Sequence, residues 1–313
     1  STLFPYTTLF RSLELQQSLL RTPKALDYVV KKRGLTRQTI QDFMVGFAPD
    51  DGSSLVTALT KRGFSKQELA DAGLTNRFGG DLYRGRMVVA LMDATGRVVG
   101  FTGRIIHDEA NAPKYLNTPQ TLLFDKSRHI FGLSQAKEAI RKSDEVVIVE
   151  GNLDVVSSHQ AGVRQVVATA GTAITEQHLK ALSRLASRIK LAFDGDRAGL
   201  NATERAIKLS QTIGVELEVV SLPEGSKDPD ELIKTHGVKQ WELVIAKATP
   251  AVAWVIQQYS QRENVRTAEG KRRFSTASLN LIRSLHDPVE QEHYLQMVAE
   301  KTGASIEALT AKM

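Results

Sequence analysis

Carboxylate side chains follow two apolar runs of this chain, at points where a strand pattern gives way to a helix pattern. One group is EGNLD at residues 150–154, and the other is DGDRAG at residues 194–199. The carboxyl ends of parallel strands meet at one edge of a sheet, where ligands bind. Carboxylates gathered there repel each other unless a cation compensates them. Glu150, Asp194 and Asp196 are therefore candidate ligands for Mg²⁺, a hard cation that prefers oxygen donors and pairs with substrate phosphates.

A third acidic group, DPDE at residues 228–231, is open to two interpretations. An aspartate followed by proline is typical of a helix N-cap and first turn, and Asp230 would then complement the helix dipole. On these local signals, a structural role is favoured over metal binding for Asp228 and Asp230. DGD is also a weak motif that often marks a turn. Its position after a buried strand, with Glu150 at the end of another, is what favours a metal site there.

The elements that would position these carboxylates are predicted from the same stretch. We expect strands at residues 146–149, 165–168, 189–193 and 216–222, and helices at residues 154–161, 175–185 and 198–210. Short β-rich runs separated by helices of this length indicate a parallel sheet with right-handed crossovers. The sequence therefore predicts a compact α/β domain over residues 144–237.

The residues before and after this stretch have other patterns. Short helical segments, one with a capping box at residues 65–68, are followed by expected strands at residues 86–92 and 98–106 around the turn sequence DATG. We therefore expect an α+β subdomain at residues 13–143. Residues 238–313 have the apolar spacing of a helical unit.

The first twelve residues, STLFPYTTLFRS, show neither helical nor alternating periodicity. They resemble the in-frame translation of a common sequencing-adapter oligonucleotide. We interpret residues 1–12 as a scar and exclude them from the expected fold. The alternative is a genuine N-terminal tail. If the segment is a scar, upstream domains are expected to be missing.

Composition limits the classes of protein to which the chain can belong. Its 313 residues, 42% of them hydrophobic, are enough for two or three structural units. The sequence has no cysteine, which excludes disulfides and cysteine-ligated zinc. It has no apolar run long enough to span a bilayer, so we expect a soluble protein. A net charge of +6 and a pI of about 9.4 favour a polyanionic partner, although ordinary cytoplasmic proteins also show such an excess.

Basic side chains are frequent in the strand-rich stretch and just after it. They are Arg77, Arg84, Arg86, Arg97, Arg104, Lys114, Lys126 and Arg128. For any one of them, scattered surface charge is the simpler interpretation. As a set beside a metal site, they could hold nucleotide phosphates or a template backbone.

These motifs, taken in order, resemble a known family. EGNLD, AGT at residues 170–172 and DGDRAG are similar to the Toprim domain of bacterial primases, topoisomerases, recombination-mediator proteins and some nucleases. The flanking sequences narrow the resemblance to the polymerase core of bacterial DnaG-type primases. They are RGL (33–35), GFAP (46–49), GFTGR (100–104), PKYLNTP (113–119), FDK (124–126), FGL (131–133) and PEG (223–225).

The resemblance implies both a fold and an activity. The fold is α/β, a Toprim-type parallel sheet with flanking helices, preceded by a mixed α+β N-terminal subdomain and followed by a helical C-terminal subdomain that completes the polymerase core. The activity is that of a DNA primase, which makes short RNA primers on single-stranded DNA from ribonucleotides by metal-dependent nucleotidyl transfer during replication. Such an enzyme works in the bacterial cytoplasm, at the nucleoid and the replication fork.

The resemblance also assigns roles to single residues. The acidic positions that match metal ligands of the family are Glu150, Asp194, Asp196, Asp228 and Asp230, which strengthens the metal interpretation of the last two. Glu150, Asp194 and Asp196 are the expected catalytic residues. Whether Glu150 holds a metal or accepts a proton stays open. The expected cofactor is Mg²⁺, with Mn²⁺ as a substitute.

Basic residues of the family that line the nucleotide site and the nucleic-acid path are matched by Arg33, Arg104, Lys114 and Lys126. We include Arg84 and Arg86 from the basic set. The expected partners are a single-stranded DNA template and ribonucleoside triphosphates, with no membrane and a monomeric core. Primases of this kind usually have an N-terminal zinc-binding domain and a C-terminal helicase-docking domain. We recognise neither, so contact with the replicative helicase is expected only through a missing C-terminal domain.

Two other functions remain open at this point. One is a different Toprim enzyme, a nuclease or a topoisomerase strand-passage module, although we identify no partner domain with the tyrosine that a transesterifying enzyme needs. The other is a non-catalytic module that binds nucleic acid through its basic residues.

Overall fold

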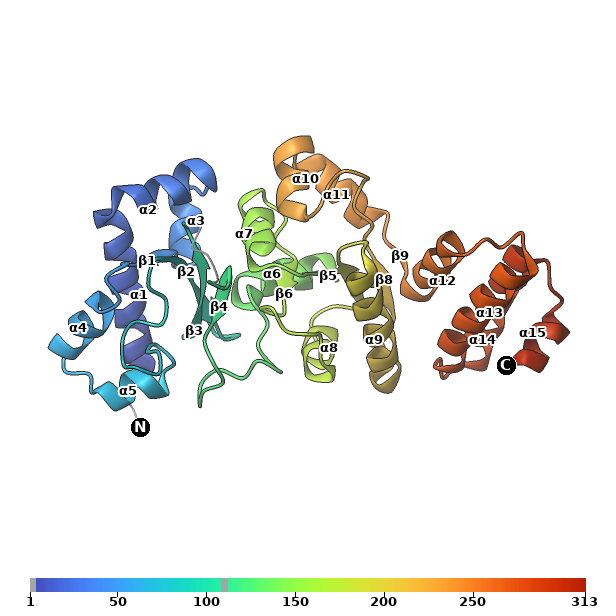
Figure 1. Cartoon of the computed structure of the whole chain (residues 1–313), viewed down its shortest axis with the longest axis horizontal. Helices are drawn as coiled ribbons and strands as arrows, with labels where there is room; N and C mark the ends of the chain where they lie inside the picture. The colour runs from blue at the N-terminus through green and yellow to red at the C-terminus, as the bar shows by residue number, and fades with distance from the viewer. Residues whose placement is uncertain (1–3, 108–111) are drawn as a thin grey trace. The chain divides into compact units, whose positions relative to one another are not determined.

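The computed structural model describes residues 4–107 and 112–313 (Figure 1). The chain forms two compact units. The first consists of Ser1–Ala139 and Gly151–Thr172, and the second of Ile140–Glu150 and Ala173–Met313. Within the described residues, no helix combines the length and apolar character needed to cross a lipid bilayer.

The first unit contains an antiparallel sheet and short helices. Its helices are α1 (Phe4–Arg21), α2 (Pro23–Asp27), the π-helix η1 (Tyr28–Lys32), α3 (Arg37–Asp42), α4 (Ser54–Lys61), α5 (Lys66–Asp71) and α7 (Asn152–Gln160). Its strands are β1 (Gly46–Ala48), β2 (Arg86–Met92), β3 (Val98–Ile105), β4 (Tyr115–Asn117) and β6 (Val166–Ala168). Helix α6 (Leu133–Ser143) begins in this unit and ends in the second.

Strands β1 to β4 pair in chain order, and every residue of β2 is buried. Burial on both faces of the sheet explains why β2 is an almost unbroken apolar run. The turn between β2 and β3 is the expected one. Asp93 Oδ1 accepts a hydrogen bond from the Thr95 N–H at 2.9 Å, and Gly96 has a φ of 88°, a value that glycine adopts without strain.

Helix α1 differs from the expectation for the start of the chain. It covers residues 4–12, where the sequence shows no helical periodicity, while residues 1–3 lie outside the described part. Arg11 and Ser12 are each 1% exposed. Figure 1 shows α1 beside the antiparallel sheet, where it packs against β1 and β3. Tertiary packing of this kind forms helices where the local pattern is weak. The adapter origin of the segment stays a prediction.

The second unit contains a mostly parallel sheet and the remaining helices. Its strands are β5 (Glu145–Val149), β7 (Arg188–Ala192), β8 (Leu217–Val219) and β9 (Thr249–Pro250). Its helices are α8 (Glu176–Ser183), α9 (Arg197–Ile213), α10 (Pro229–His236), α11 (Val238–Ala246), α12 (Ala251–Arg262), α13 (Ala268–Arg283), α14 (Pro288–Thr302) and α15 (Ile306–Lys312).

Strands β5, β7 and β8 are parallel, and β9 pairs antiparallel with β8. This arrangement confirms the α/β fold class. Val149 at the end of β5 lies opposite Ala192 at the end of β7, so the residues that follow both strands emerge at the same edge. Lys190 in the middle of β7 is 3% exposed, and its Nζ lies 2.8 Å from Glu145 Oε2 and 2.9 Å from the Ile245 carbonyl oxygen.

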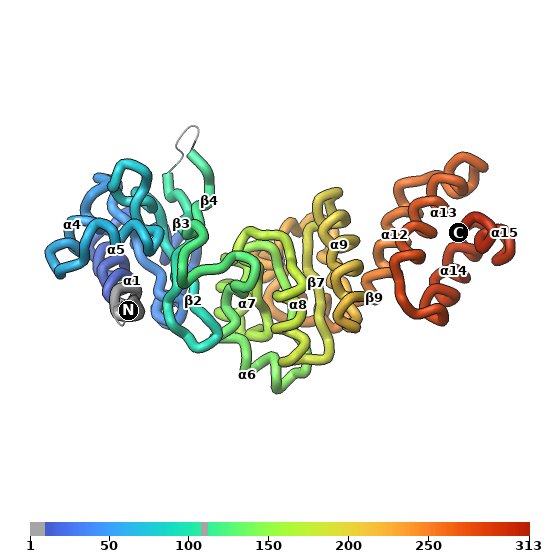
Figure 2. Tube along the Cα trace, turned by 90° about the horizontal axis from the view of Figure 1, so that it is seen from below, coloured from blue at the N-terminus to red at the C-terminus, as the bar shows by residue number. Residues whose placement is uncertain are grey.

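The end of the chain is helical, as expected. In Figures 1 and 2, α12, α13, α14 and α15 group together, and neighbouring helices of this group pack on each other. Trp241 of α11 is fully buried. The C-terminal helices follow directly on β9, which links them to the sheet of the second unit.

Candidate functional site

Two strand-end carboxylates meet at the edge of the parallel sheet. Glu150 directly follows β5, and Asp194 comes two residues after β7. Glu150 Oε1 accepts a hydrogen bond from the backbone N–H of Asp194 at 3.1 Å. The expectation that parallel register brings these two residues together is therefore confirmed.

Asp196 begins helix α9 and is held close to Asp194 by a tight backbone approach. Its Oδ1 accepts a hydrogen bond from the Gly199 N–H at 2.8 Å, which makes it the N-cap of α9. A Cβ added to Gly199 would lie 1.8 Å from the carbonyl oxygen of Asp194. Only glycine fits this close contact, so the DGDRAG sequence fixes where the helix starts relative to the acidic loop.

Asp228 and Asp230 have the local contacts of a helix start. Asp228 is the N-cap of α10, with its Oδ1 accepting from the Glu231 N–H at 2.8 Å. Asp230 Oδ2 lies 2.6 Å from Lys234 Nζ, one turn further along the helix. These contacts agree with the capping interpretation, and the cap engages one of the two carboxylate oxygens of Asp228.

The acidic residues influence one another electrostatically. Loss of water around Glu150 raises the pKa of its carboxyl group, and the charges of Asp194 and Asp196 raise it further. The pKa of Asp194 is also raised, first by burial and then by the charges of Asp196 and Asp228. The structure therefore connects four of the five predicted metal ligands through mutual repulsion. Asp230 forms an ion pair with Lys234.

A hard divalent cation fits this set of donors in charge and chemistry. The carboxylates supply the oxygen ligands that Mg²⁺ prefers, and a cation would relieve the repulsion that raises the pKa of Glu150 and Asp194. Within residues 4–107 and 112–313, however, no group of three His, Asp or Glu side chains is arranged to hold a metal ion. Asp196 and Asp228 point one oxygen at a helix N-terminus instead. Coordination by the whole set requires some of these side chains to rotate.

The predicted basic residues belong to the first unit. Two of them, Arg33 and Arg104, lie near Tyr115. Arg104 on β3 lies opposite Tyr115 on β4. Its guanidinium carbon is 5.2 Å from the centre of the Tyr115 ring, and its Nη1 donates a hydrogen bond to the hydroxyl group. Burial raises the pKa of Tyr115, while the charges of Arg104 and Arg33 oppose this rise and Asp154 adds to it. Arg33, Arg104 and Tyr115 therefore form one cluster with Asp154.

Arg33 has a second aromatic neighbour. Its Nε and Nη2 each donate to the Tyr28 hydroxyl at 3.2 Å, and its guanidinium carbon lies 5.6 Å from the Tyr28 ring centre. The sequence patterns predict no role for Tyr28 or Tyr115. Tyr28 lies five residues before Arg33, and their contact depends on how the helical segment packs. Tyr115 and Arg104 belong to different strands, and their contact depends on the strand register.

The other predicted basic residues differ in exposure. Arg84 and Lys114 are exposed and Lys126 is half-buried. Arg86 is 4% exposed, and its Nη1 donates to the Lys114 carbonyl oxygen at 3.3 Å. Its side chain also covers Gly103, where a Cβ would lie 3.1 Å from Arg86 Cδ. Arg86 thus packs inside the first unit, and a direct contact of its guanidinium with nucleic acid is not supported by its burial.

Three family descriptions match the chain. The description "DNA primase catalytic core, N-terminal domain" matches residues 13–137, "Toprim-like" matches residues 147–233, and "DnaB-helicase binding domain of primase" matches residues 252–307. A DNA primase of Synechococcus elongatus is 38% identical over 98% of this chain and 46% of its own length. The chain spans about half the length of the curated relatives that it matches.

Solved structures are similar over nearly the whole chain. A DNA primase domain from Pseudomonas aeruginosa is 32% identical with a TM-score of 0.82, covering 99% of this chain and 98% of that one. A DnaG primase catalytic domain bound to single-stranded DNA is 31% identical with a TM-score of 0.81, covering 98% of both chains.

The helicase-binding match changes one expectation. We expected the helicase to be contacted only through a missing C-terminal domain, but residues 252–307 match a helicase-binding family. The similar catalytic cores also extend over these helices. The C-terminal helices are therefore part of the core and, at the same time, resemble a helicase-binding element.

Proposed function

Because the chain belongs to the family of bacterial DnaG-type DNA primases and corresponds to their catalytic core, we propose that it makes short RNA primers on single-stranded DNA. The observation that carries this proposal is the meeting of Glu150, Asp194 and Asp196 at the carboxyl edge of a parallel sheet in a chain that matches primase cores from end to end. Ribonucleoside triphosphates are the proposed substrates.

Primases of this family depend on metal ions. We propose Mg²⁺, with Mn²⁺ as a substitute, and Glu150, Asp194, Asp196, Asp228 and Asp230 as the residues that hold it. A bound divalent ion would stabilise the charge that develops on the phosphates and on the leaving pyrophosphate. Asp194 and Asp196 lie on the short loop after β7, so one loop would place both against the triphosphate.

Glu150 is suited to a second task as well. Its raised pKa makes its carboxylate a better proton acceptor than an isolated glutamate. It could therefore receive the proton of the attacking primer 3′-hydroxyl while Asp194 and Asp196 bind the metal. Lys234 competes for Asp230, so the pair must open before Asp230 can serve as a ligand.

The first unit would hold the template. Arg33, Arg104 and Lys114 supply positive charge for the DNA backbone, and Tyr115, which is 44% exposed, offers a ring on which a base can stack. Binding through phosphates releases counterions and weakens as salt is added. The same cluster would favour single strands, since the stacking face of a base is available only when the base is unpaired.

We also propose contacts beyond the template. The match of residues 252–307 to a helicase-binding family supports contact between the C-terminal helices and the replicative helicase. We further propose that the protein acts as a monomer at the replication fork, in the bacterial nucleoid.

Incubating the protein with single-stranded DNA, labelled ribonucleotides and Mg²⁺ tests the proposed function. Short RNA products that require both template and metal are the expected result. Nicked DNA would instead identify a nuclease or topoisomerase module. Binding of DNA without any product would identify a non-catalytic module.

A further inference from the structure

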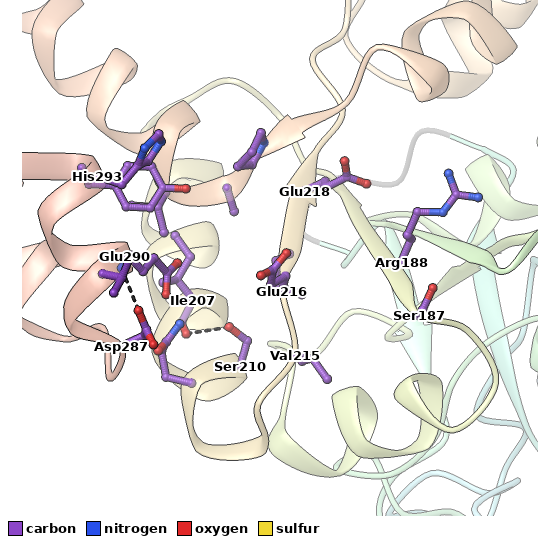
Figure 3. Close-up of a pocket in the computed structure, with 17 residues that line it drawn as sticks. Ser187, Arg188, Ile207, Ser210, Val215, Glu216, Glu218, Asp287, Glu290 and His293 are labelled. Atoms are coloured by element: carbon purple, nitrogen blue, oxygen red, sulfur yellow. Dashed lines mark hydrogen bonds between the residues drawn. The ribbon is translucent and has the colours of Figure 1, made fainter. Parts of the chain in front are cut away.

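A cavity of about 760 Å³ lies in the second unit, apart from the proposed metal ligands (Figure 3). It is bounded by the end of α9, the strands β8 and β9, and the start of α14. Its size is within the range of small-molecule sites, roughly 300–1,000 Å³. Part of its wall is apolar and includes Ile207, Leu217, Val252 and Val289.

Carboxylates form much of the remaining wall. They are Glu216, Glu218, Asp287 and Glu290. Figure 3 shows Asp287 and Glu290 on the α14 side and Glu216 on the β8 side. Burial raises the pKa of Glu290, the charges of Glu216 and Asp287 raise it further, and His293 opposes the rise. The cavity therefore concentrates negative charge in a chain whose net charge is +6.

Arg188 also lines the cavity, but its guanidinium is engaged elsewhere. Its Nη1 lies 3.6 Å from Glu145 Oε2, and its Nη2 donates to the Ser143 carbonyl oxygen at 2.9 Å. Asp287 Oδ1 caps α14 by accepting from the Glu290 N–H at 2.8 Å. Neither contact neutralises Glu216 or Glu290.

A buried polar side chain faces this cavity without a partner. Tyr294 lines it and is 6% exposed, yet its hydroxyl group makes no hydrogen bond with any residue in the described part of the chain. Burial and the charges of Glu290 and Glu216 raise the pKa of Tyr294 to about 12, so the phenol stays neutral. Glu218 Oε2 is itself buried and has no hydrogen-bond partner among the described residues. A buried oxygen without a partner destabilises a protein, so a ligand that donates a hydrogen bond to Glu218 would be stabilising, and the Tyr294 hydroxyl oxygen offers it a second acceptor.

The spacing of these groups points to an extended cation and not to a metal ion. Among the residues that the structure describes, no three acidic or histidine side chains are close enough to share one ion. An alkylammonium group has three N–H donors that can reach separate acceptors. Its methylene chain can lie against the apolar wall, and an aromatic ring such as that of Tyr294 attracts the cation.

We propose that this cavity binds an alkylammonium group carried on an aliphatic chain, either a free polyamine or the lysine side chain of a partner protein. Glu216 and Glu290 hold the ammonium group, and Tyr294 contributes its hydroxyl oxygen and its ring. This site does not depend on the proposed primer synthesis.

Calorimetric titration without DNA or nucleotides tests the site. The probes are spermidine, for a free polyamine, and Nα-acetyl-lysine amide, for a lysine side chain. We expect one bound spermidine per chain. Glu290→Gln should weaken binding about tenfold, because it removes the negative charge that pairs with the ammonium group. Tyr294→Phe should weaken binding about threefold, because it removes the hydroxyl oxygen that accepts one hydrogen bond from the cation. Glu292→Gln is the matched control, since Glu292 is exposed on the same helix and does not line the cavity.

The two probes also distinguish the source of the ligand. Much tighter binding of spermidine than of the lysine amide assigns the site to a free polyamine, and comparable binding assigns it to a lysine side chain. The proposal is wrong if neither probe binds, or if Glu290→Gln and Tyr294→Phe bind as well as Glu292→Gln. A thermal melt of each variant verifies that it is folded.

Discussion

Replacing Gly199 by alanine should destabilise the second unit strongly. The added Cβ would lie 1.8 Å from the carbonyl oxygen of Asp194, whereas non-bonded atoms rest roughly 3.5 Å apart. The start of α9 or the acidic loop must therefore shift by more than about 1 Å. Both partners are backbone, so no side-chain rotation relieves the clash. Overpacking costs about 1–3 kcal/mol and sometimes more, and we expect about 3 kcal/mol here because a helix must move.

Urea unfolding followed by tryptophan fluorescence measures this effect in the second unit alone. Both tryptophans of the chain, Trp241 and Trp254, belong to that unit. Gly195→Ala is the matched control. Gly195 belongs to the same motif, but a Cβ there would meet nothing within 4 Å and its φ is not positive. The control should stay within about 0.5 kcal/mol of the parent protein. If Gly199→Ala unfolds at the same urea concentration as Gly195→Ala, the close approach of α9 to the acidic loop is refuted.

The remaining predictions concern burial, charge and DNA binding. Lys190→Ala should lower the free energy of unfolding by about 1–3 kcal/mol, measured in urea, because the Ile245 carbonyl loses its buried donor and Glu145 keeps only the more exposed Arg188. In the metal-free protein, Asp194→Asn should melt at a higher temperature than the parent at pH 7. The raised pKa of Asp194 makes its charged form unfavourable, so this advantage should shrink as the pH falls through that pKa. Lys114→Ala should weaken binding of single-stranded DNA and reduce the slope of log K against log salt by about 0.7, measured by fluorescence anisotropy.

The two lysine predictions have matched controls, and each of the three predictions has an outcome that contradicts it. Lys180→Ala removes a lysine from an exposed ion pair and should change stability by less than about 0.5 kcal/mol. An equal loss in Lys190→Ala and Lys180→Ala would contradict the buried pair. A pH-independent difference in melting temperature for Asp194→Asn would contradict the repulsion among the carboxylates. Lys208→Ala removes the same charge from an exposed position on α9. An identical salt slope in both lysine variants would argue against a template contact at Lys114.

The sheet and the position of the carboxylates could be predicted because local patterns determine them. Each expected strand of the α/β stretch is present, with both ends within three residues of the predicted ones. Parallel strands share an edge, so Glu150 and Asp194 meet without any information on long-range contacts. The capping contact of Asp228 could also be predicted, because an aspartate followed by proline is typical of a helix start.

Features that depend on tertiary packing could not be predicted. Helix α1, which packs on β1 and β3, begins at Phe4 and so includes a segment without helical periodicity. Arg86 looks like a surface arginine in the sequence but is buried against Gly103. The pairing of Arg104 with Tyr115 depends on strand register. The two-residue strand β9 is too short for any pattern.

Primer synthesis by Asp194→Ala tests the central claim most directly. The assay uses single-stranded DNA, labelled ribonucleotides and Mg²⁺, with Glu300→Ala as the control, because Glu300 is an exposed carboxylate on α14. We predict that Asp194→Ala binds DNA as the parent protein does but makes no RNA, while Glu300→Ala makes primers normally. Metal-dependent RNA synthesis by Asp194→Ala at the parent rate would contradict the assignment of the acidic edge as the site of catalysis.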